Sequence, residues 1–283
     1  MNLSIDIGGT KIRFALVDNN KILKADEFLN NTKDYKWNIL KIQKKFEEWN
    51  SKIDFIGIAC PGPLNIKDGI IINSPNLDDW NGKNLKLEFK NIMNIDDIRV
   101  NNDANVAALG QFNIRKNLDS LVYFTISTGI GCGFINKGEI YNGFSETACE
   151  IANAFPDLSI GKNKTGIEFF ASGLNIVKKL NSLGVVVSSA KEAFSLLKTN
   201  SDKIVSEYFL LIKDKLITMF STAIYFLNPE IIVLGGSVTL NNKEWFSEIF
   251  RDVLEVTQDI NYKTKLEFAL NLDDSTLIGC SNL

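Results

Sequence analysis

Two stretches of the chain are built alike, SIDIGGTKIRFALVD (residues 4–18) and YFTISTGIGCGFINK (residues 123–137). Each consists of an apolar strand, a glycine-rich turn and a second apolar strand. Strands and helical stretches alternate after each copy, which is typical of α/β folds. The repeat therefore predicts two α/β lobes with equivalent starts and a cleft between them.

The pattern between the two copies supports this organisation. Apolar residues at 37, 39, 40, 42, 46 and 49 predict a helix over 36–50, and FIGIAC (55–60) and DIRVNND (97–103) predict buried strands. Later helices are expected at roughly 165–182, 189–198 and 201–227, followed by a strand in NPEIIVLGGSV (228–238). We expect a first lobe over 1–117, with 271–283 packing back on it, and a second lobe over 118–270.

Composition excludes several classes of protein. The net charge of -3 lacks the basic excess of a nucleic-acid surface. The four cysteines form no CxxC pair and the chain has no histidine, so a structural zinc site is not expected. The most apolar helical stretch, 216–227, is shorter than a membrane span, and no signal peptide is evident at the start. With unpaired thiols, these features predict a cytoplasmic protein without a membrane partner.

The first glycine turn, DIGGTK, is a candidate phosphate site. Glycines in such a turn let backbone N–H groups approach an anion, and the turn adds a hydroxyl and a cation. The candidate phosphate-binding residues are Gly8, Gly9, Thr10 and Lys11. Asp6, at the end of the first strand, is a candidate to hold a hydrated Mg²⁺. The alternative is a tight hairpin turn with a solvated lysine.

Two later glycine clusters extend this picture. STGIGCG (127–133) offers Thr128, Gly129 and Gly131 to a polyphosphate, and the alternative is a bulged hairpin. Gly235 and Gly236 end the apolar strand near residue 234 and leave a flat slot for an adenine ring, the alternative being an ordinary turn. Two glycine turns opening equivalent lobes are stronger evidence than either turn alone.

The segment NNDANVAALGQ (101–111) supplies the candidate base. Without histidine, a base acting near neutral pH must be a carboxylate or a lysine. Asp103 follows a strand and precedes a helix, which is where α/β sheets place ligand chemistry. Asp103 is therefore the candidate general base that accepts a proton from a hydroxyl group. Asn102 is the candidate to orient the sugar that carries this hydroxyl. The alternative is that one of these two side chains merely caps the helix.

Taken together, these motifs resemble the ROK family of sugar kinases, within the actin-like, hexokinase-like ATPase fold (ribonuclease H-like). The resemblance covers nearly the whole chain. GIACPGPLN (57–65) and NSPNLDDWNG (73–82) resemble the family's sugar-lobe loops, which implies sugar contacts from Gly62 and Asn76. The remaining motifs match the family's two phosphate motifs, its catalytic segment and its adenosine motif in the same order. The resemblance implies ATP and Mg²⁺ as cofactors and a homodimer.

One region departs from the family pattern. Where the family has G-E-I-G-H and a cysteine-rich zinc loop, this chain has C-E-I-A-N (149–153) and SIGKNKTGIEFFASG (159–173). Ser159, Gly161 and Gly166 occupy the cysteine positions, so no structural zinc is expected. The resemblance implies sugar contacts from Glu150 and Glu168, with Asn153 standing where the family histidine would be.

The function expected from this resemblance is phosphorylation of the C6 hydroxyl of a hexose by ATP. The S-T-G-I-G form of the second turn resembles bacterial N-acetylmannosamine kinases, and the altered region lies at the C2 end of the sugar, where an N-acetyl group needs room. N-acetylmannosamine is therefore the preferred substrate. The alternatives are a glucokinase, another kinase of this family acting on N-acetylglucosamine or fructose, and a non-catalytic sugar sensor. Only five residues precede Asp6, so we expect no DNA-binding domain.

Overall fold

The structure is a computed structural model that describes residues 1–161, 165–199, 202–258 and 261–283. The chain divides into two compact units. The first contains Met1–Leu118, Gly133–Ala148 and Leu270–Leu283, and the second contains Asp119–Cys132 and Cys149–Ala269. The expected lobe assignment had grouped residues 133–148 with the second lobe. Sheets and helices alternate in both units, which confirms the α/β class.

The first unit is built on a five-stranded mixed sheet of order β3-β2-β1-β4-β7. Its strands are β1 (Asn2–Ile7), β2 (Lys11–Asp18), β3 (Lys21–Leu29), β4 (Ile56–Cys60) and β7 (Ile98–Asn102). β1, β4 and β7 run parallel, whereas β2 and β3 are antiparallel additions at one edge. The parallel strands therefore bring the ends of β1, β4 and β7 to the same edge of the sheet.

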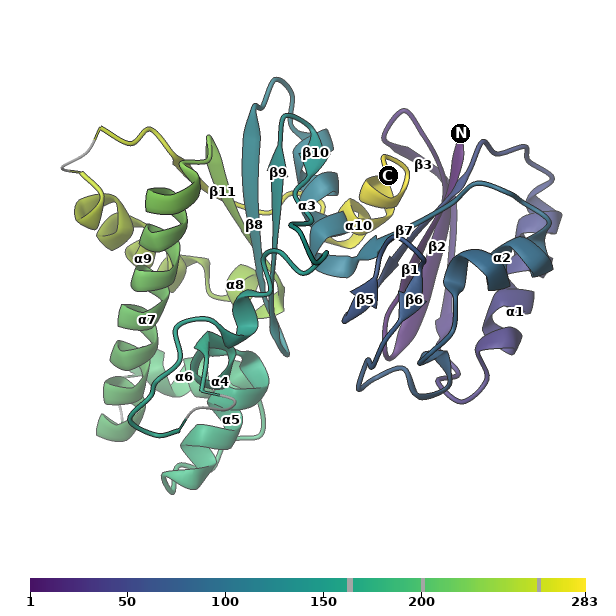
Figure 1. Ribbon diagram of the computed structural model, residues 1–283. Helices are drawn as coiled ribbons and strands as arrows, with labels where there is room; N and C mark the ends of the chain where they lie inside the picture. The colour runs from purple at the N-terminus through teal and green to yellow at the C-terminus, as the bar shows by residue number, and fades with distance from the viewer. Residues whose placement is uncertain (162–164, 200–201, 259–260) are drawn as a thin grey trace. The chain divides into compact units, whose positions relative to one another are not determined.

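The first unit also contains further helices and short strands. They are α1 (Tyr35–Trp49), β5 (Leu64–Asn65), β6 (Ile70–Ile71), the 3₁₀ helix η1 (Asp78–Trp80), α2 (Leu85–Met93), α3 (Asp103–Ile114), β10 (Glu139–Ile140) and α10 (Leu272–Cys280). In Figure 1, α1 and α2 lie on one face of the first sheet, and α3 and α10 lie on the other.

Residue size explains which helices cover which face. Large apolar residues such as Leu3, Ile5 and Phe14 pack toward α1 and α2. The other face carries small residues, and there α10 lies so close that a Cβ on Gly57 would clash with the backbone of Cys280. Gly110 of α3 meets the backbone of Ser275 of α10 in the same way. Small side chains thus let two helices approach the sheet and each other closely.

The second sheet has the order β10-β9-β8-β11-β12. Its other strands are β8 (Ser120–Ile126), β9 (Ile130–Asn136), β11 (Ile231–Gly235) and β12 (Lys265–Phe268). β11 lies between β8 and β12, parallel to both, and all five of its residues are buried. This confirms the buried strand expected in NPEIIVLGGSV.

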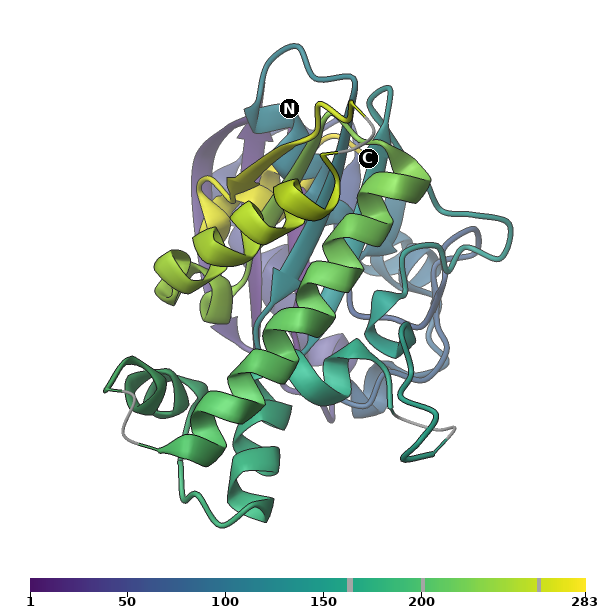
Figure 2. The same cartoon turned by 90° about the vertical axis from the view of Figure 1, so that its left-hand side faces the viewer.

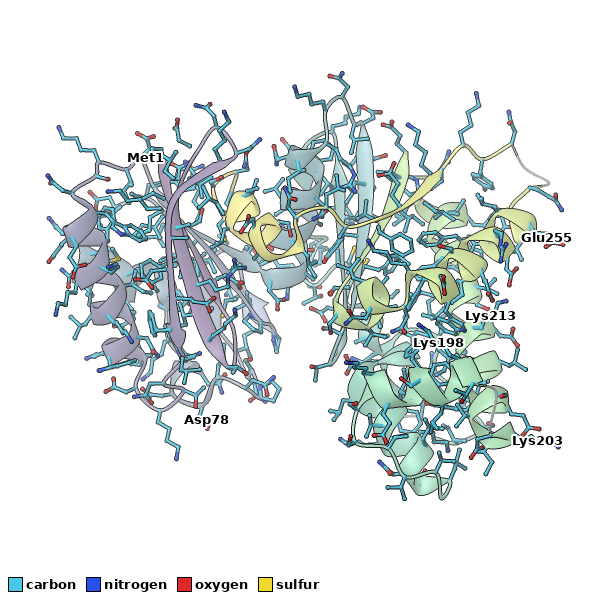
Figure 3. The ribbon with its side chains drawn as sticks, turned by 180° about the vertical axis from the view of Figure 1, so that it is seen from behind. Met1, Asp78, Lys198, Lys203, Lys213 and Glu255 are labelled. Atoms are coloured by element: carbon cyan, nitrogen blue, oxygen red, sulfur yellow. The ribbon has the colours of Figure 1, made fainter. Side chains whose placement is uncertain are left out.

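The helices of the second unit are η2 (Ile151–Asn153), α4 (Ile167–Ala171), α5 (Gly173–Ser182), α6 (Ala190–Thr199), α7 (Lys203–Leu227), α8 (Ser237–Asn241) and α9 (Lys243–Val256). Figure 2 shows α7 running diagonally across this unit, with α9 beside it. The rings of Phe124 on β8 and Phe220 on α7 lie 5.2 Å apart, and Lys213 of α7, labelled in Figure 3, pairs with Asp252 of α9 at 2.7 Å.

One expected helix is divided in two. The sequence predicted a single helix over about 165–182, but the structure has α4 and α5 with Ser172 between them. The Ser172 hydroxyl accepts a hydrogen bond from the Asn175 N–H at 3.3 Å, so Ser172 caps a new helix. Across the described part of the chain, no helix combines the length and apolar character needed to cross a membrane.

Candidate active site

The candidate base is the first residue of α3. Asn102 is the N-cap, and its Oδ1 accepts hydrogen bonds from the N–H groups of Ala104 (2.9 Å) and Asn105 (3.4 Å). Asp103 Oδ1 accepts a further bond from Ala104 N–H at 2.8 Å. The capping role considered for both residues therefore falls mainly to Asn102. The Asp103 carboxylate is not required for capping, because a capping side chain is already present.

Asp6, near the end of β1, lies near Asp103, which directly follows β7, in the first unit. The pKa of Asp6 is raised to about 6, mainly by burial and then by the charge of Asp103, while the charges of Arg13 and Lys11 oppose the rise. Burial also raises the pKa of Asp103, while the N–H groups of Ala104 and Asp103 itself lower it. Two carboxylates thus share a region that disfavours negative charge.

Two thiols lie beside this carboxylate pair. Cys60 ends β4, the strand between β1 and β7, and its pKa is raised by burial and then by the charges of Asp103 and Asp6. Cys280 of α10 donates from Sγ to the carbonyl of Ile5 at 3.3 Å, and burial and the Asp6 charge raise its pKa. Both groups are therefore neutral thiols near neutral pH. They do not complete a metal site: the described residues contain no group of three or more His, Cys, Asp or Glu suited to hold a metal ion.

An asparagine network behind Asp103 was not expected. Asn101 Oδ1 accepts from the Asn102 N–H at 2.8 Å and from Asn105 Nδ2 at 3.1 Å. Asn101 Nδ2 donates to Asn142 Oδ1 at 3.1 Å. The buried amide of Asn101 therefore fixes the junction between β7 and α3, where Asn102 and Asp103 lie. Asn101 is part of the NNDANVAALGQ segment, but no sequence signal pointed to Asn142.

The first glycine turn is a hydrogen-bonded hairpin. Gly8 N–H donates to the Lys11 carbonyl at 3.0 Å, and the Gly8 carbonyl accepts from Asn30 Nδ2 at 2.7 Å. Lys11 Nζ pairs with Glu27 at 2.9 Å. Of the candidate phosphate groups, the Gly8 amide is therefore engaged within the turn and the Lys11 ammonium has a carboxylate partner. The backbone N–H groups of Gly9 and Thr10 are the other candidate phosphate donors of this turn.

The first turn packs against the candidate sugar loop. A Cβ on Gly9 would lie 2.8 Å from Asn76 Cβ, so the absence of a side chain permits this contact. Asn30 extends the connection, because its Oδ1 accepts from Trp80 Nε1 at 3.4 Å. Gly62, the other candidate in the sugar loops, precedes a cis Gly62–Pro63 bond. Asn30 directly follows β3, a strand without a buried residue, and carried no sequence signal.

The second glycine turn lies between β8 and β9. Two carbonyl groups of this turn accept hydrogen bonds from the first residues of α5. Gly173 N–H donates to the Ser127 carbonyl at 2.7 Å, and Leu174 N–H donates to the Thr128 carbonyl at 3.3 Å. On the other side, Glu168 Oε2 accepts from the Ile130 N–H at 2.8 Å. Thr128 and Gly129 therefore lie in a turn held by hydrogen bonds, and Gly131 is the second residue of β9.

The candidate sugar residues of the second unit lie on two adjoining segments. Glu150 directly precedes the 3₁₀ helix η2, Asn153 is the last residue of η2, and Glu168 is in the first turn of α4. Ile167 N–H donates to the Ala154 carbonyl at 2.8 Å, and a Cβ on Gly166 would lie 2.5 Å from the backbone of Asn153. These contacts hold the backbone at Asn153 and Ala154 against the start of α4, the helix that carries Glu168. Of the positions that match the family's zinc loop, Ser159, Gly161 and Gly166 are described, whereas residues 162–164 lie outside the described residues.

Gly235 and Gly236 directly precede Ser237, which lines a pocket of the second unit. Gly236 has a positive φ of 90°, and a Cβ there would clash with the backbone of Ile126. A cavity of about 390 Å³ opens next to it between α6 and α8. It is lined by Ala190, Lys191, Phe194, Ser195, Lys198, Ser237, Val238, Asn241 and Asn242. Lys198 is labelled in Figure 3. The α6 side of this pocket was missed from the sequence.

Comparison with known proteins gives a match over the full length of the chain. The model of the ROK family matches residues 2–283. An uncharacterized protein of Clostridium perfringens is 29% identical over 94% of this chain and 91% of its own length. A glucokinase of Pyrobaculum calidifontis is 27% identical (85% and 80% covered), and an N-acetylmannosamine kinase of Vibrio cholerae is 28% identical (84% and 84%).

Solved structures match the fold. A ROK hexokinase from Thermus thermophilus superimposes with a TM-score of 0.88 at 21% identity, covering 99% of this chain and 96% of the other. A ROK family glucokinase from Streptomyces griseus in complex with glucose and AMPPNP gives a TM-score of 0.75 at 20% identity, covering 99% and 98%. The fold is therefore the actin-like ATPase fold expected from the motifs.

Proposed function

The chain belongs to the ROK family, and from this premise we propose that it is an ATP-dependent sugar kinase that phosphorylates the C6 hydroxyl of a hexose. The observation that carries the proposal is the position of Asp103. This carboxylate begins a helix whose cap is already supplied by Asn102, and it lies near Asp6 in a chain without histidine.

Asp103 is the general base of the proposed reaction. Its carboxylate accepts the proton of the 6-hydroxyl while the hydroxyl oxygen attacks the γ-phosphorus of ATP, and ADP leaves. The transition state of phosphoryl transfer is loose, so the proton can leave late and a carboxylate of modest basicity suffices. The raised pKa of Asp103 increases that basicity. Asn102 keeps its own Nδ2 for the same sugar, because the cap uses only its Oδ1.

The glycine turns are proposed to bind the phosphates of ATP. Backbone N–H groups of Gly9, Thr10, Thr128, Gly129 and Gly131 are the donors we assign to this role. The pocket next to Gly235 and Gly236 is proposed to take the adenine ring, because its wall combines the Phe194 ring with polar groups such as Ser195 and Asn241. A complex of the Streptomyces griseus relative with AMPPNP supports nucleotide binding by this fold.

Magnesium fits the acidic pair. Asp6 and Asp103 raise each other's energy when both are ionised, and a divalent cation near Asp6 relieves that repulsion. Magnesium usually keeps several waters and binds through one or two carboxylates plus substrate phosphates, which agrees with the small number of protein ligands here. When bound with the nucleotide, the ion supplies positive charge to the β- and γ-phosphates.

For the sugar, we propose N-acetylmannosamine. Glu150, Asn153 and Glu168 of the second unit, with Gly62, Asn76 and Asn102 of the first, are the proposed sugar contacts. Asn153 replaces an imidazole and keeps the ability to donate and accept hydrogen bonds. Relatives named N-acetylmannosamine kinase and glucokinase match at similar identity, so glucose is the second candidate.

A panel of sugars tests this assignment. ADP release is measured with Mg-ATP and N-acetylmannosamine, glucose, N-acetylglucosamine, fructose or no sugar, and the product is identified by mass spectrometry and phosphorus NMR. The proposal predicts sugar-dependent ADP release and a 6-phosphate, with N-acetylmannosamine turned over fastest. If glucose is turned over fastest, the assignment of N-acetylmannosamine as the substrate is wrong, while the assignment of the reaction as sugar phosphorylation stands.

A sugar sensor without turnover is the other candidate. A xylose repressor of Caldicellulosiruptor bescii is 25% identical over 86% of this chain and 65% of its own length. Sugar binding without ADP release in the presence of Mg-ATP would favour this role.

We further propose that the kinase is a cytoplasmic homodimer, and sedimentation or light scattering of the purified protein tests the dimer.

A further inference from the structure

The carboxylate of Glu168 contacts the second glycine turn and also belongs to the proposed sugar site. Its Oε2 accepts the Ile130 N–H at 2.8 Å. The same oxygen occupies the space next to Gly129, where a Cβ would lie 2.8 Å from it. Glu168 therefore touches the turn at two successive residues, and Gly129 has no side chain at the place where the carboxylate lies.

The backbone of Glu168 is fixed by the corner between α4 and α5. Its carbonyl accepts hydrogen bonds from the Ser172 N–H at 3.2 Å and from Asn175 Nδ2 at 3.0 Å. The same corner donates N–H groups to the carbonyls of Ser127 and Thr128. The α4–α5 corner thus holds the start of the turn through its backbone, and the Glu168 side chain holds the end of the turn at Ile130.

The contact between Glu168 and Ile130 determines which groups are left to bind phosphate and sugar. The Ile130 amide is directed at a carboxylate, so it does not serve as a phosphate donor. A carboxylate near a phosphate site is electrostatically unfavourable unless its charge is used for hydrogen bonds. Its two oxygens offer about four acceptor positions, so the bond to Ile130 leaves capacity for sugar hydroxyls.

We propose that Glu168 is a positioning residue for the phosphate-binding turn, and that through it the bound sugar and the bound nucleotide influence each other's affinity. This proposal rests on the proposed kinase function for its ligands. A sugar hydroxyl bound to Glu168 fixes the carboxylate, the carboxylate fixes Ile130, and the turn is then ordered for the phosphates. By thermodynamic linkage, the nucleotide must strengthen sugar binding by the same factor.

Two substitutions separate the two roles of Glu168. In Glu168→Gln the amide oxygen can still accept the Ile130 N–H, but the negative charge available to the sugar is removed. In Glu168→Ala both the acceptor and the charge are removed. Glu207→Gln on α7 is the matched control, because this exposed carboxylate pairs at 3.5 Å with Lys203, a surface lysine one helical turn away.

Affinity for Mg-ADP is measured by calorimetry in the absence of sugar. We expect Glu168→Ala to weaken nucleotide binding on the order of tenfold, because the turn no longer has a hydrogen bond to a charged acceptor. Glu168→Gln should stay within about threefold of the wild type, and Glu207→Gln should be unchanged. Both Glu168 variants should bind the sugar more weakly. Equal Mg-ADP affinity in wild type and Glu168→Ala, or equal losses of affinity in Glu168→Ala and Glu168→Gln, would overturn the proposal.

Hydrogen–deuterium exchange of the peptide covering 127–131 gives a readout without any ligand. Faster exchange in Glu168→Ala but not in Glu168→Gln supports the positioning role, and unchanged exchange in both contradicts it. If Glu168→Ala does not fold, Glu168→Asp replaces it, because the shorter side chain cannot reach Ile130 from the same backbone. A wild type that binds no nucleotide would refute the kinase function, while the exchange result would still decide the role of Glu168.

Discussion

Asp6 lies near the end of β1 and Asp103 directly follows the parallel strand β7 of the same sheet, and after burial the negative charge of Asp103 is the main reason why the pKa of Asp6 rises to about 6. Only β4 separates their strands. The fold therefore keeps two carboxylates near each other although their repulsion and their burial cost stability. Destabilised groups of this kind are typical of functional sites.

Asp6→Asn should stabilise the protein at high pH. Because the pKa of Asp6 is higher in the folded chain than the ordinary value of 3.8, the folded state binds more protons than the unfolded state between about pH 6 and pH 4. Ionised Asp6 therefore lowers the free energy of unfolding above pH 6, and protonation removes this penalty as the pH falls. The gain in free energy of unfolding on substitution should be about 2 kcal/mol larger at pH 8 than at pH 4.5.

Chemical denaturation of both proteins at the two pH values measures this difference. Asp96→Asn is the control, because Asp96 is 91% exposed and pairs with Lys90 at the surface. A stabilisation by Asp6→Asn that does not change with pH would contradict the assigned cause. The same ionisation should control activity, so sugar-dependent turnover of the wild type should fall as the pH drops through about 6.

Gly110→Ala should destabilise the first unit. A methyl group at residue 110 would meet the carbonyl of Ser275 and lie 3.1 Å from the Gly279 nitrogen, both backbone atoms of α10. Helix backbone cannot rotate away as a side chain can, so the helices must separate. We expect a loss of about 1–3 kcal/mol in the free energy of unfolding. Thermal unfolding checks this, and Asn113→Ala on the same helix should cost less; an unchanged melting temperature in Gly110→Ala would exclude the close packing.

Ser195→Trp should block the proposed adenine pocket. Ser195 is an exposed residue of α6 that lines the cavity next to Gly236, and an indole there fills part of its volume. We expect the KM for ATP to rise about tenfold or more, with sugar affinity nearly unchanged, because displacing the purine from its pocket should cost on the order of 1–3 kcal/mol of binding free energy.

Leu210→Trp is the matched control, because Leu210 is exposed and lines a neighbouring pocket shared by α6, α7 and α9. It should leave the KM for ATP near the wild-type value. Equal effects of the two substitutions, or none from Ser195→Trp, would place the adenine ring elsewhere.

The sequence predicted those parts of the fold that have strong local periodicity. The helix expected over 36–50 is α1 (Tyr35–Trp49), and the apolar run IIVLG is a fully buried strand. The break between α4 and α5 was missed, because the serine that causes it is common inside loops and helices alike. Its capping role depends on a hydrogen bond that sequence periodicity does not show.

Contacts between residues far apart in the chain could not be predicted from the sequence. Asn30 holds the carbonyl of Gly8 from 22 residues away, and Glu168 holds the amide of Ile130 from 38 residues away. Glu168 was proposed from family resemblance as a sugar contact, and Asn30 was not proposed at all. The strand order that brings Asp6 near Asp103 likewise depends on how β1, β4 and β7 pair, which no local pattern specifies.

The most direct test of the proposed function compares sugar-dependent ADP release by the wild type and by Asp103→Asn at saturating Mg-ATP. Asparagine preserves the size of the side chain and an oxygen for the Ala104 N–H, so the helix start should remain intact while the base is removed. We predict turnover on a hexose by the wild type, a fall in kcat of about 10²- to 10⁴-fold in the variant, and sugar affinity that changes little. Sugar-dependent turnover by Asp103→Asn at the wild-type rate would contradict the role of Asp103 as the base.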